Sequence, residues 1–244
     1  MTFANRVAVV TGGAGRIGRP LCEKLAAAGV AVAVVDINAE GAEAEAEKIR
    51  QTGGKARGYG MDIQSSENVR DASSRILSDF GRADILISNA GVWRRQLIEE
   101  MDEDFWNFHI NLNLNGVFRV TKAFLPGMLE RGYGRIINLG SIAGEVGLPF
   151  YGAYATSKAG VIMFTKTLAM EVAKRGVTVN CISPGMIGDS PSGPIKQTWI
   201  ERWGTGPEVA DLIMFLAADE ASFITGVDYT IDGGRILGPR FADV

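Results

Sequence analysis

Two titratable residues, Tyr154 and Lys158, stand four positions apart in a stretch with helical character. At this spacing two side chains project from the same face of a helix, with roughly 5–6 Å between their Cβ atoms. A free tyrosine titrates at about 10, and an ammonium at ~5 Å favours the phenolate by about 3 kcal/mol at an effective dielectric of ~20, or roughly two pKa units. The pair therefore predicts a phenol that acts as general acid and base at about pH 8. Because the same spacing arises by chance in helices, other elements must position a substrate and a cofactor beside it.

A glycine-rich turn follows the first predicted strand, residues 6–10, and precedes a helical pattern that ends at Ala28. In this turn Gly13, Gly15 and Gly18 form a Gly-x-Gly-x-x-Gly pattern. The missing side chains permit a tight turn and let backbone amides and a helix N-terminus approach a pyrophosphate. Its position between a strand and a helix makes the pattern specific, and it predicts a dinucleotide-binding turn.

Asp36 follows the second predicted strand, residues 30–35. In a dinucleotide site an acid at this point accepts hydrogen bonds from the adenosine ribose, and it would repel the 2′-phosphate of NADP. Neither Ile37 nor Asn38 supplies a compensating cation, so the sequence favours NAD. Arg16, in the glycine turn, argues against NAD if its side chain reaches a phosphate. The alternative is that Arg16 faces solvent from the first helical turn.

Small or polar residues also follow later strands at their carboxyl ends, where open parallel sheets bind ligands. Asp62 and Ile63 follow the predicted strand 55–60 and are expected in the adenine pocket. Asp62 can also cap the predicted helix 65–80. Residues 88–91 are small and follow the next strand, so their backbone can lie against a cofactor.

Two segments are candidates for substrate contacts. Trp93, Arg94 and Arg95 place two cations beside an aromatic residue, and they either recognise an acidic substrate or form a solvated loop. Residues 186–206 are rich in Gly, Pro and Ser and contain two tryptophans. This composition is typical of a loop, with room for one short helix, that covers a ligand cleft.

The segment 102–132 is predicted to form one long amphipathic helix, although Asn111, Asn113 and Asn115 in its middle are poor helix formers. Proline cannot continue a sheet ladder, so Pro184 is predicted to lie beyond the end of its strand. The remaining predicted strands are at 84–87, 135–139, 177–182 and 227–231. The remaining predicted helices are at 39–51, closed by Gly53 and Gly54, at 207–218, beginning with Pro207, and a helix that carries Tyr154 and ends at Arg175.

The composition argues against several classes of function. The 244 residues carry a net charge of −3 with both signs scattered, so no surface for nucleic acid or an anionic membrane is indicated. Cys22 and Cys181 lack metal-ligand spacing, which favours buried thiols in a reducing compartment and no metal site. His109 is the only histidine and is interpreted as structural, because no Gly-x-Ser-x-Gly pattern accompanies it. No apolar run reaches ~20 residues, and we expect a cytoplasmic protein with a small-molecule partner.

Together these features resemble the short-chain dehydrogenase/reductase family over essentially the whole chain. The residues that carry the resemblance are the turn 11–18, Asp62, Asn89, Ala90, Gly91, Asn113, Gly116, Ser141, Tyr154, Lys158, Pro184, Gly185 and the segment 232–234. The resemblance implies a doubly wound, Rossmann-type α/β fold in three layers, with a seven-stranded parallel sheet and helices on both faces. It also implies that residues 1–244 form a single domain and that the protein is a homotetramer.

The resemblance further implies a catalytic tetrad of Asn113, Ser141, Tyr154 and Lys158. Ser141 would hydrogen-bond the reacting oxygen, and Tyr154 would donate or remove its proton. Lys158 would depress the tyrosine pKa and hold the nicotinamide ribose, while Asn113 would stabilise a water leading from Lys158 to solvent. The implied activity is hydride transfer between a nicotinamide cofactor and a secondary alcohol or ketone. The alternatives are an NADP-dependent reductase of the 3-oxoacyl-carrier-protein or pteridine type, and a dinucleotide-binding protein of low turnover.

Two positions depart from the family pattern. Arg16 stands where the family most often has glycine, and Asp189 stands where a threonine commonly contacts the nicotinamide carboxamide, a contact that Ser190 could replace. The expected cofactor-binding residues are Gly12, Gly13, Gly15, Arg16, Ile17, Gly18, Asp36, Ile37, Asp62, Ile63, Asn89, Ala90, Gly91, Tyr154, Lys158, Pro184, Gly185 and Ile187. The expected substrate-binding residues, which select no particular compound, are Trp93, Arg94, Ser141, Glu145, Phe150, Tyr151, Met186, Ile187 and Trp199.

Overall fold

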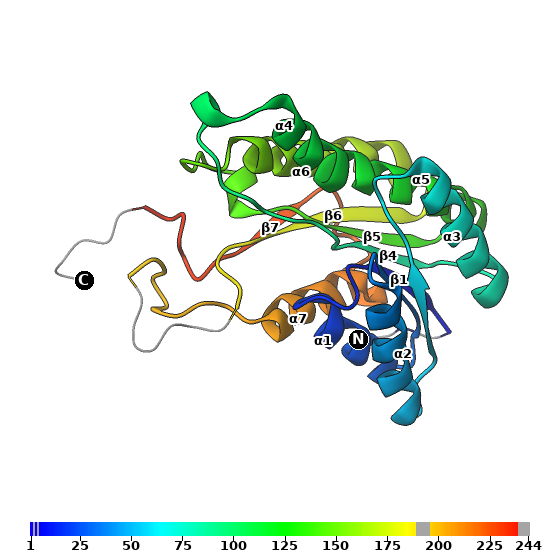
Figure 1. Cartoon of the computed structure of the whole chain (residues 1–244). Coiled ribbons are helices and arrows are strands. Elements are labelled where there is room, and N and C mark those ends of the chain that lie inside the picture. Colours follow the sequence, from blue (N-terminus) through cyan, green and yellow to red (C-terminus); the bar gives the residue numbers. More distant parts are fainter. Residues whose placement is uncertain (2, 4, 189–195, 239–244) are drawn as a thin grey trace.

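The computed structural model describes residues 1, 3, 5–188 and 196–238. Within these residues, seven parallel strands form one sheet in the order β3-β2-β1-β4-β5-β6-β7 (Figure 1). The strands are β1 Val7–Thr11, β2 Ala31–Asp36, β3 Ala56–Gly60, β4 Ile85–Ser88, β5 Gly134–Leu139, β6 Val177–Pro184 and β7 Asp228–Ile231. The α-helices are α1 Gly18–Ala27, α2 Ala39–Gln51, α3 Ser66–Phe80, α4 Glu103–His109, α5 Gly116–Arg131, α6 Gly152–Val172 and α7 Gly206–Ala217. The predicted Rossmann-type architecture is confirmed.

Helices cover both faces of the sheet, with α1, α2 and α7 on one face and α3, α5 and α6 on the other (Figure 1). The alternation within β1 explains both layers, because Ala8 and Val10 pack toward the first group of helices and Val9 packs toward the second. All five residues of β1 are buried, as expected for a strand covered on two sides. Cys22 and Cys181 are buried free thiols, as predicted, and burial raises the pKa of each.

Side-chain caps fix the start of four helices, including α4, which Asp102 caps. Asn38 caps α2 and Ser65 caps α3, so the interpretation of Asp62 as a helix cap is wrong. The Asp62 carboxylate instead accepts a hydrogen bond from the backbone of Gln64 in the turn before the helix. Thr205 and Glu208 form a capping box at α7. Because the cap lies at Thr205, this helix begins one residue earlier than predicted, at Gly206.

The predicted helix over residues 102–132 is confirmed in its extent, since helical winding runs from Glu103 to Arg131, but the winding is not uniform. Helix α4 ends at His109, a π-helical segment spans Ile110–Asn115, and α5 begins at Gly116. The wider winding accommodates asparagines that would be unfavourable in a regular α-helix, and such segments often occur at functional sites. His109 is fully buried, with its Nδ1 2.9 Å from the Phe105 carbonyl oxygen.

Most predicted strands differ from the observed ones by a single residue at one or both ends, and the larger differences are in β6 and α6. Strand β6 continues through Ser183 and Pro184, which pair with Thr230 and Ile231 of β7. Proline can occupy this position because it is the last residue of the strand. The regular winding of α6 ends at Val172, and a 3-10 turn continues to Arg175. None of the described helices is long and apolar enough to cross a membrane.

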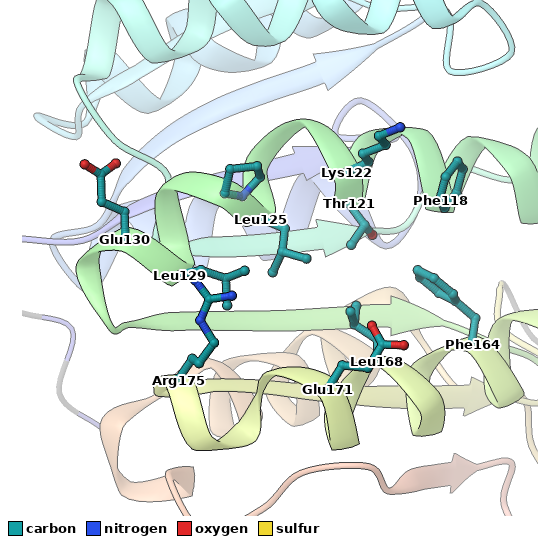
Figure 2. Close-up of a pocket in the computed structure, with 11 residues that line it drawn as sticks. Phe118, Thr121, Lys122, Leu125, Leu129, Glu130, Phe164, Leu168, Glu171 and Arg175 are labelled. Carbon is teal, nitrogen blue, oxygen red and sulfur yellow. The ribbon is translucent and has the colours of Figure 1, made fainter.

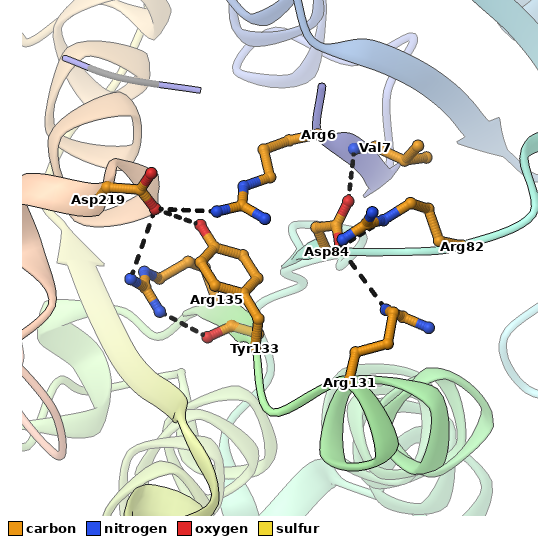
Figure 3. Close-up of polar contacts among 9 residues, drawn as sticks. Arg6, Val7, Arg82, Asp84, Arg131, Tyr133, Arg135 and Asp219 are labelled. Atoms are coloured by element: carbon orange, nitrogen blue, oxygen red, sulfur yellow. Dashed lines mark hydrogen bonds and ion pairs between the residues drawn. The ribbon is translucent and has the colours of Figure 1, made fainter. Parts of the chain in front are cut away.

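Charged residues join the amino ends of the strands (Figure 3). Asp84 is fully buried, accepts the Val7 amide at 2.9 Å and forms an ion pair with Arg82 at 2.6 Å. A second carboxylate, Asp219, accepts the Tyr133 hydroxyl at 2.7 Å. Burial and this hydrogen bond raise the pKa of Tyr133 to about 12, which keeps the phenol a donor at neutral pH. These contacts connect the strands at their amino ends. The predicted ligand-binding residues follow the carboxyl ends of the strands, on the opposite side of the sheet.

Candidate active site

The predicted phosphate-binding turn joins β1 to α1 and is closed by a contact that the sequence did not reveal. The Asn89 amide donates to the carbonyl oxygens of Thr11 and Gly12, both at 3.0 Å. Gly12 has a φ of +64°, and a Cβ there would lie 2.8 Å from the Asn89 amide nitrogen. A Cβ at Gly18 would lie 2.1 Å from the Gly12 oxygen. Glycine is therefore required at both positions by backbone conformation and close approach.

Thr11 organises the same turn and was noted from sequence only as its first residue. Its hydroxyl donates to the Ile87 carbonyl oxygen at 3.2 Å and accepts the amides of Asn89 and Ala90, both at 3.1 Å. One side chain thus connects the end of β1 to the segment after β4. The only signal in the sequence was its place directly before the glycines.

Asp36 lies at the end of β2, as predicted, and its carboxylate faces the glycine turn. One oxygen accepts the Ala14 amide at 3.2 Å, and the other accepts the Asn38 amide at 3.1 Å. The neighbouring Ile37 side chain is 70% exposed. The carboxylate is therefore preoriented beside the turn by two backbone donors.

Arg16 makes a contact that neither of the two sequence-based alternatives included. Its Nη1 donates to the Ile187 carbonyl oxygen at 3.0 Å, which links the glycine turn to the segment after β6. A Cβ added at Gly188 would lie 2.3 Å from the same nitrogen. The guanidinium thus rests against the start of the predicted substrate loop. Asp189 and Ser190, expected near the nicotinamide carboxamide, lie outside the described residues.

Ile63, expected in the adenine pocket, is buried against the start of α5. A Cβ at Gly116 would lie 2.7 Å from the Ile63 side chain. Arg119, which sequence reasoning missed, donates to the Ile63 carbonyl at 3.2 Å and to the Asn111 side-chain oxygen at 2.8 Å. This arginine therefore ties the π-helical segment to the loop after β3.

Asn113 is fully buried and holds the loop after β4 with both ends of its amide. The Val92 amide donates to its Oδ1 at 3.0 Å, and its Nδ2 donates to the Val92 carbonyl at 2.9 Å. The same Nδ2 contacts the Ser157 hydroxyl at 3.3 Å. A Cβ at Gly91 would lie 3.0 Å from the Asn113 oxygen and 3.4 Å from the Lys158 ammonium nitrogen. The structure therefore brings Asn113 and Lys158 to the same backbone segment.

Lys158 is buried on α6 and donates to the Leu139 carbonyl oxygen at 2.7 Å, at the end of β5. Desolvation lowers the pKa of Lys158 to about 8. Its ammonium nitrogen lies 5.9 Å from the centre of the Tyr154 ring. Near neutral pH this amine is therefore close to its titration range and can both release and accept a proton.

The expectation of a lowered tyrosine pKa is not met. Burial raises the pKa of Tyr154, and a hydrogen bond from Ser141 offsets only part of that rise. The physical reason is that removing a phenolate from water outweighs the attractions that act on it here. Ser141 is itself fixed, because its hydroxyl accepts the Ala143 amide at 3.1 Å.

The predicted substrate residues separate into groups. The Tyr151 ring lies 6.1 Å from Tyr154 and 6.2 Å from Trp93, so three aromatic rings form a continuous series. Arg94 instead lies over Phe108 of α4, at 4.5 Å.

Glu145 accepts the Thr230 hydroxyl at 2.9 Å, and burial raises the pKa of its carboxyl. Met186 contacts Arg235, and Trp199 packs against Gly234, so both meet the segment after β7. Gly185 donates to the Ile231 carbonyl at 2.9 Å.

A large groove of about 610 Å³ lies away from this site, on the outer face between α5 and α6 (Figure 2). Its apolar lining includes Phe118, Leu125, Phe164 and Leu168. None of the predicted cofactor or substrate residues lines it. Its position suggests packing against another surface, and we do not assign it to the reaction.

A doubly wound parallel sheet with a glycine turn after β1 and an acid at the end of β2 is typical of the class of dinucleotide-binding proteins. A family model described as short chain dehydrogenase matches residues 6–198. The chain is 37% identical to the 3-oxoacyl-(acyl-carrier-protein) reductase FabG of Escherichia coli, over 97% of this chain and all of that protein. It is 35% identical to the Thermotoga maritima protein of the same name, with the same coverage.

Among solved structures, the crystal structure of gox2181 matches with a TM-score of 0.92 and 33% identity, over 97% of this chain and 98% of that one. The chain belongs to the short-chain dehydrogenase/reductase family. It is therefore an oxidoreductase that uses a nicotinamide cofactor and acts on CH–OH or carbonyl groups.

Proposed function

We propose that this enzyme transfers a hydride between a nicotinamide cofactor, NAD in preference to NADP, and a secondary alcohol or ketone. The observation that carries the proposal is the convergence of Ser141, Tyr154 and Lys158 at the ends of β5 and α6. Asn113 holds the backbone beside Lys158. A protein that only bound a dinucleotide would need neither the serine nor the tyrosine. We also propose that the whole chain acts as one domain.

In the reductive direction Tyr154 donates a proton to the oxygen of the substrate, and Ser141 hydrogen-bonds the same oxygen. The raised pKa of Tyr154 keeps the phenol protonated and ready to donate. Lys158, with a pKa of about 8, can return the proton to the phenolate. The nicotinamide, when bound, supplies or accepts the hydride. The turn 12–18, Asp36 and the segment 89–91 would hold the dinucleotide along the sheet edge.

Two side chains support the preference for NAD. Asp36 is oriented by the Ala14 and Asn38 amides and can accept hydrogen bonds from the ribose hydroxyls. A 2′-phosphate would bring about two negative charges to the same place. Arg16, the nearby cation noted from the sequence, is engaged with the Ile187 carbonyl. This contact directs the side chain toward the segment after β6.

The names of the bacterial relatives favour a second candidate. They are called 3-oxoacyl-(acyl-carrier-protein) reductases and match this chain at 35–37% identity over nearly its full length. The same proton-transfer residues could reduce the ketone of a 3-oxoacyl thioester. This candidate differs from the first in its substrate and in its cofactor, which the sequence-based alternative gives as NADP.

We further propose a homotetramer that assembles through α5 and α6. Phe118, Met163 and Met170 are 48%, 60% and 77% exposed on these helices. The apolar groove between the helices would be covered by a second copy (Figure 2). The expectation of a cytoplasmic location stays a prediction.

The direct test is a screen of secondary alcohols, ketones and 3-oxoacyl thioesters, followed by the absorbance of NADH and NADPH. We expect turnover of simple alcohol or ketone substrates with NAD or NADH. Turnover confined to thioesters with NADPH would support the second candidate instead. Tyr154→Phe is the control in every assay, because activity that is undiminished by this change does not come from the proposed site.

A further inference from the structure

The segment Trp93–Arg95 is a fixed platform at the proposed site. At one end, Val92 makes two hydrogen bonds with the buried Asn113. At the other end, the Gln96 amide donates to the Phe150 carbonyl at 2.9 Å. The backbone of this platform is therefore anchored on both sides, while Trp93, Arg94 and Arg95 themselves are exposed to solvent.

Phe150 supplies a second indication that this region is built for a purpose. Its φ is +72°, the left-handed conformation that a bulky residue rarely adopts. The side chain nevertheless remains 43% exposed, so burial in the core does not explain the strain. Backbone strain of this kind clusters at ligand sites. Here the strained residue both anchors the platform and presents its ring to Arg95.

Arg95 lies over two aromatic rings, and within the described part of the chain it has no anionic partner. Its guanidinium carbon lies 5.3 Å from the centre of the Phe150 ring and 5.6 Å from that of Tyr151. No hydrogen bond or ion pair joins it to any residue that the structure describes, including Glu99 and Glu100 in the following 3-10 turn. A cation–π contact does not use the N–H donors of a guanidinium, so those of Arg95 remain available to an oxyanion.

The stack leads directly to the proposed general acid. Tyr151 lies against Arg95 on one side and 6.1 Å from the Tyr154 ring on the other. The Arg95 guanidinium carbon is therefore no more than about 12 Å from the centre of the Tyr154 ring. One small molecule can span this distance, with its reacting oxygen at Tyr154 and an anionic group at Arg95.

We propose that Arg95 recognises an oxyanion on the substrate, so that the substrate is an oxo or hydroxy compound bearing a carboxylate or a phosphate. This inference rests on the proposed function, because it takes Tyr154 as the residue at the reacting oxygen. A guanidinium binds either anion through paired, charge-assisted hydrogen bonds. Arg94, over Phe108, adds a second positive charge to the same platform.

The test uses methyl-ketone acids with one to six methylene groups between the ketone and the carboxylate. Each acid is compared with its methyl ester and with the phosphate ester of a keto alcohol, in which phosphate replaces the carboxylate. These assays use NADH and wild-type enzyme. At the best chain length we expect kcat/KM for the anionic compound to exceed that for the methyl ester by ~10-fold to 100-fold. The ratio of kcat/KM for the carboxylic acid to kcat/KM for the phosphate identifies which oxyanion the site prefers.

Arg95→Ala should remove the difference between acid and ester, and Arg95→Lys should restore part of it by returning the charge without the planar fork. Arg70→Ala, which removes an exposed cation from α3, is the matched control and should keep the difference. Equal turnover of acids and esters by the wild type would overturn the proposal. A preference that survives in Arg95→Ala would overturn it equally.

Calorimetric titration of the enzyme–NAD⁺ complex, which has no hydride to give a ketone, with the best acid and its ester separates this proposal from the proposed function. Binding of the acid that is tighter than binding of the ester, and that depends on Arg95, would sustain the anion site even without turnover. Acid binding no tighter than ester binding would reject the anion site, even if ketones are reduced and the proposed function holds.

Discussion

Replacing Lys158 by Met should reduce activity and change how stability depends on pH. The free energy of unfolding of the variant, relative to that of the wild type, should be greater at neutral pH than at high pH. The ammonium is buried, and its pKa falls from 10.5 to about 8 on folding. Because one pKa unit corresponds to ~1.4 kcal/mol, folding with the charged lysine costs ~3 kcal/mol at pH 7. Methionine avoids this cost but leaves the Leu139 carbonyl without its donor, which costs ~1–3 kcal/mol. The net change at pH 7 is therefore small, and its pH dependence is the informative quantity.

Between about pH 8 and pH 10.5 the unfolded chain holds the Lys158 proton while the folded chain does not. Stability of the wild type from this group therefore rises with pH in that window, and the cost is fully present below it. From pH 7 to pH 9.5, the free energy of unfolding of the wild type should gain ~2 kcal/mol relative to Lys158→Met. Urea unfolding at matched protein concentration measures this difference.

Lys55→Met, which removes an exposed lysine before β3, is the control and should show no such pH-dependent difference. Turnover and cofactor affinity of Lys158→Met should both fall, since we assign this lysine to proton transfer and to the nicotinamide ribose. A difference in unfolding free energy that stays constant from pH 7 to pH 9.5 would refute the assignment of a desolvated ammonium.

Three further predictions concern the reaction, the cofactor and assembly. Tyr154→Phe should lower kcat by ~10²–10⁴-fold while NADH affinity is nearly unchanged, and near-normal activity in a steady-state assay would contradict its role as acid and base. Fluorescence titration should show that NADH binds at least ~10-fold tighter than NADPH. Asp36→Ala should reduce this difference in affinity, and adding Arg16→Ala to Asp36→Ala should increase it again. Equal affinities of the wild type for NADH and NADPH would show that the attraction of Arg16 for the 2′-phosphate offsets its repulsion by Asp36. Light scattering should show a tetramer, which Phe118→Glu weakens, and a wild-type monomer at micromolar concentration would exclude the assembly.

The sequence was sufficient for the order of the elements and for most of the residues at the sheet edge. Strand periodicity, the glycine spacing before α1 and Asp36 after β2 are local patterns, and each corresponds to a feature within one or two elements of the structure. The α2 prediction agrees with the structure at both ends, because an N-cap asparagine and a Gly-Gly pair mark them. Proximity of Tyr154 and Lys158 also followed from helical spacing alone.

Properties that depend on surroundings were decided only by the tertiary structure. The Tyr154 pKa depends on how completely distant segments exclude water, and spacing to Lys158 carries no information about that exclusion. The π turn between α4 and α5 carries Asn113, whose amide accepts a hydrogen bond from Val92, 21 residues away in sequence. Arg95 stacks on Phe150 and Tyr151 because the loop after β4 meets the loop after β5 in space. Local sequence specifies which groups are available, whereas burial and long-range contacts determine their charge, their orientation and the partner that each one meets.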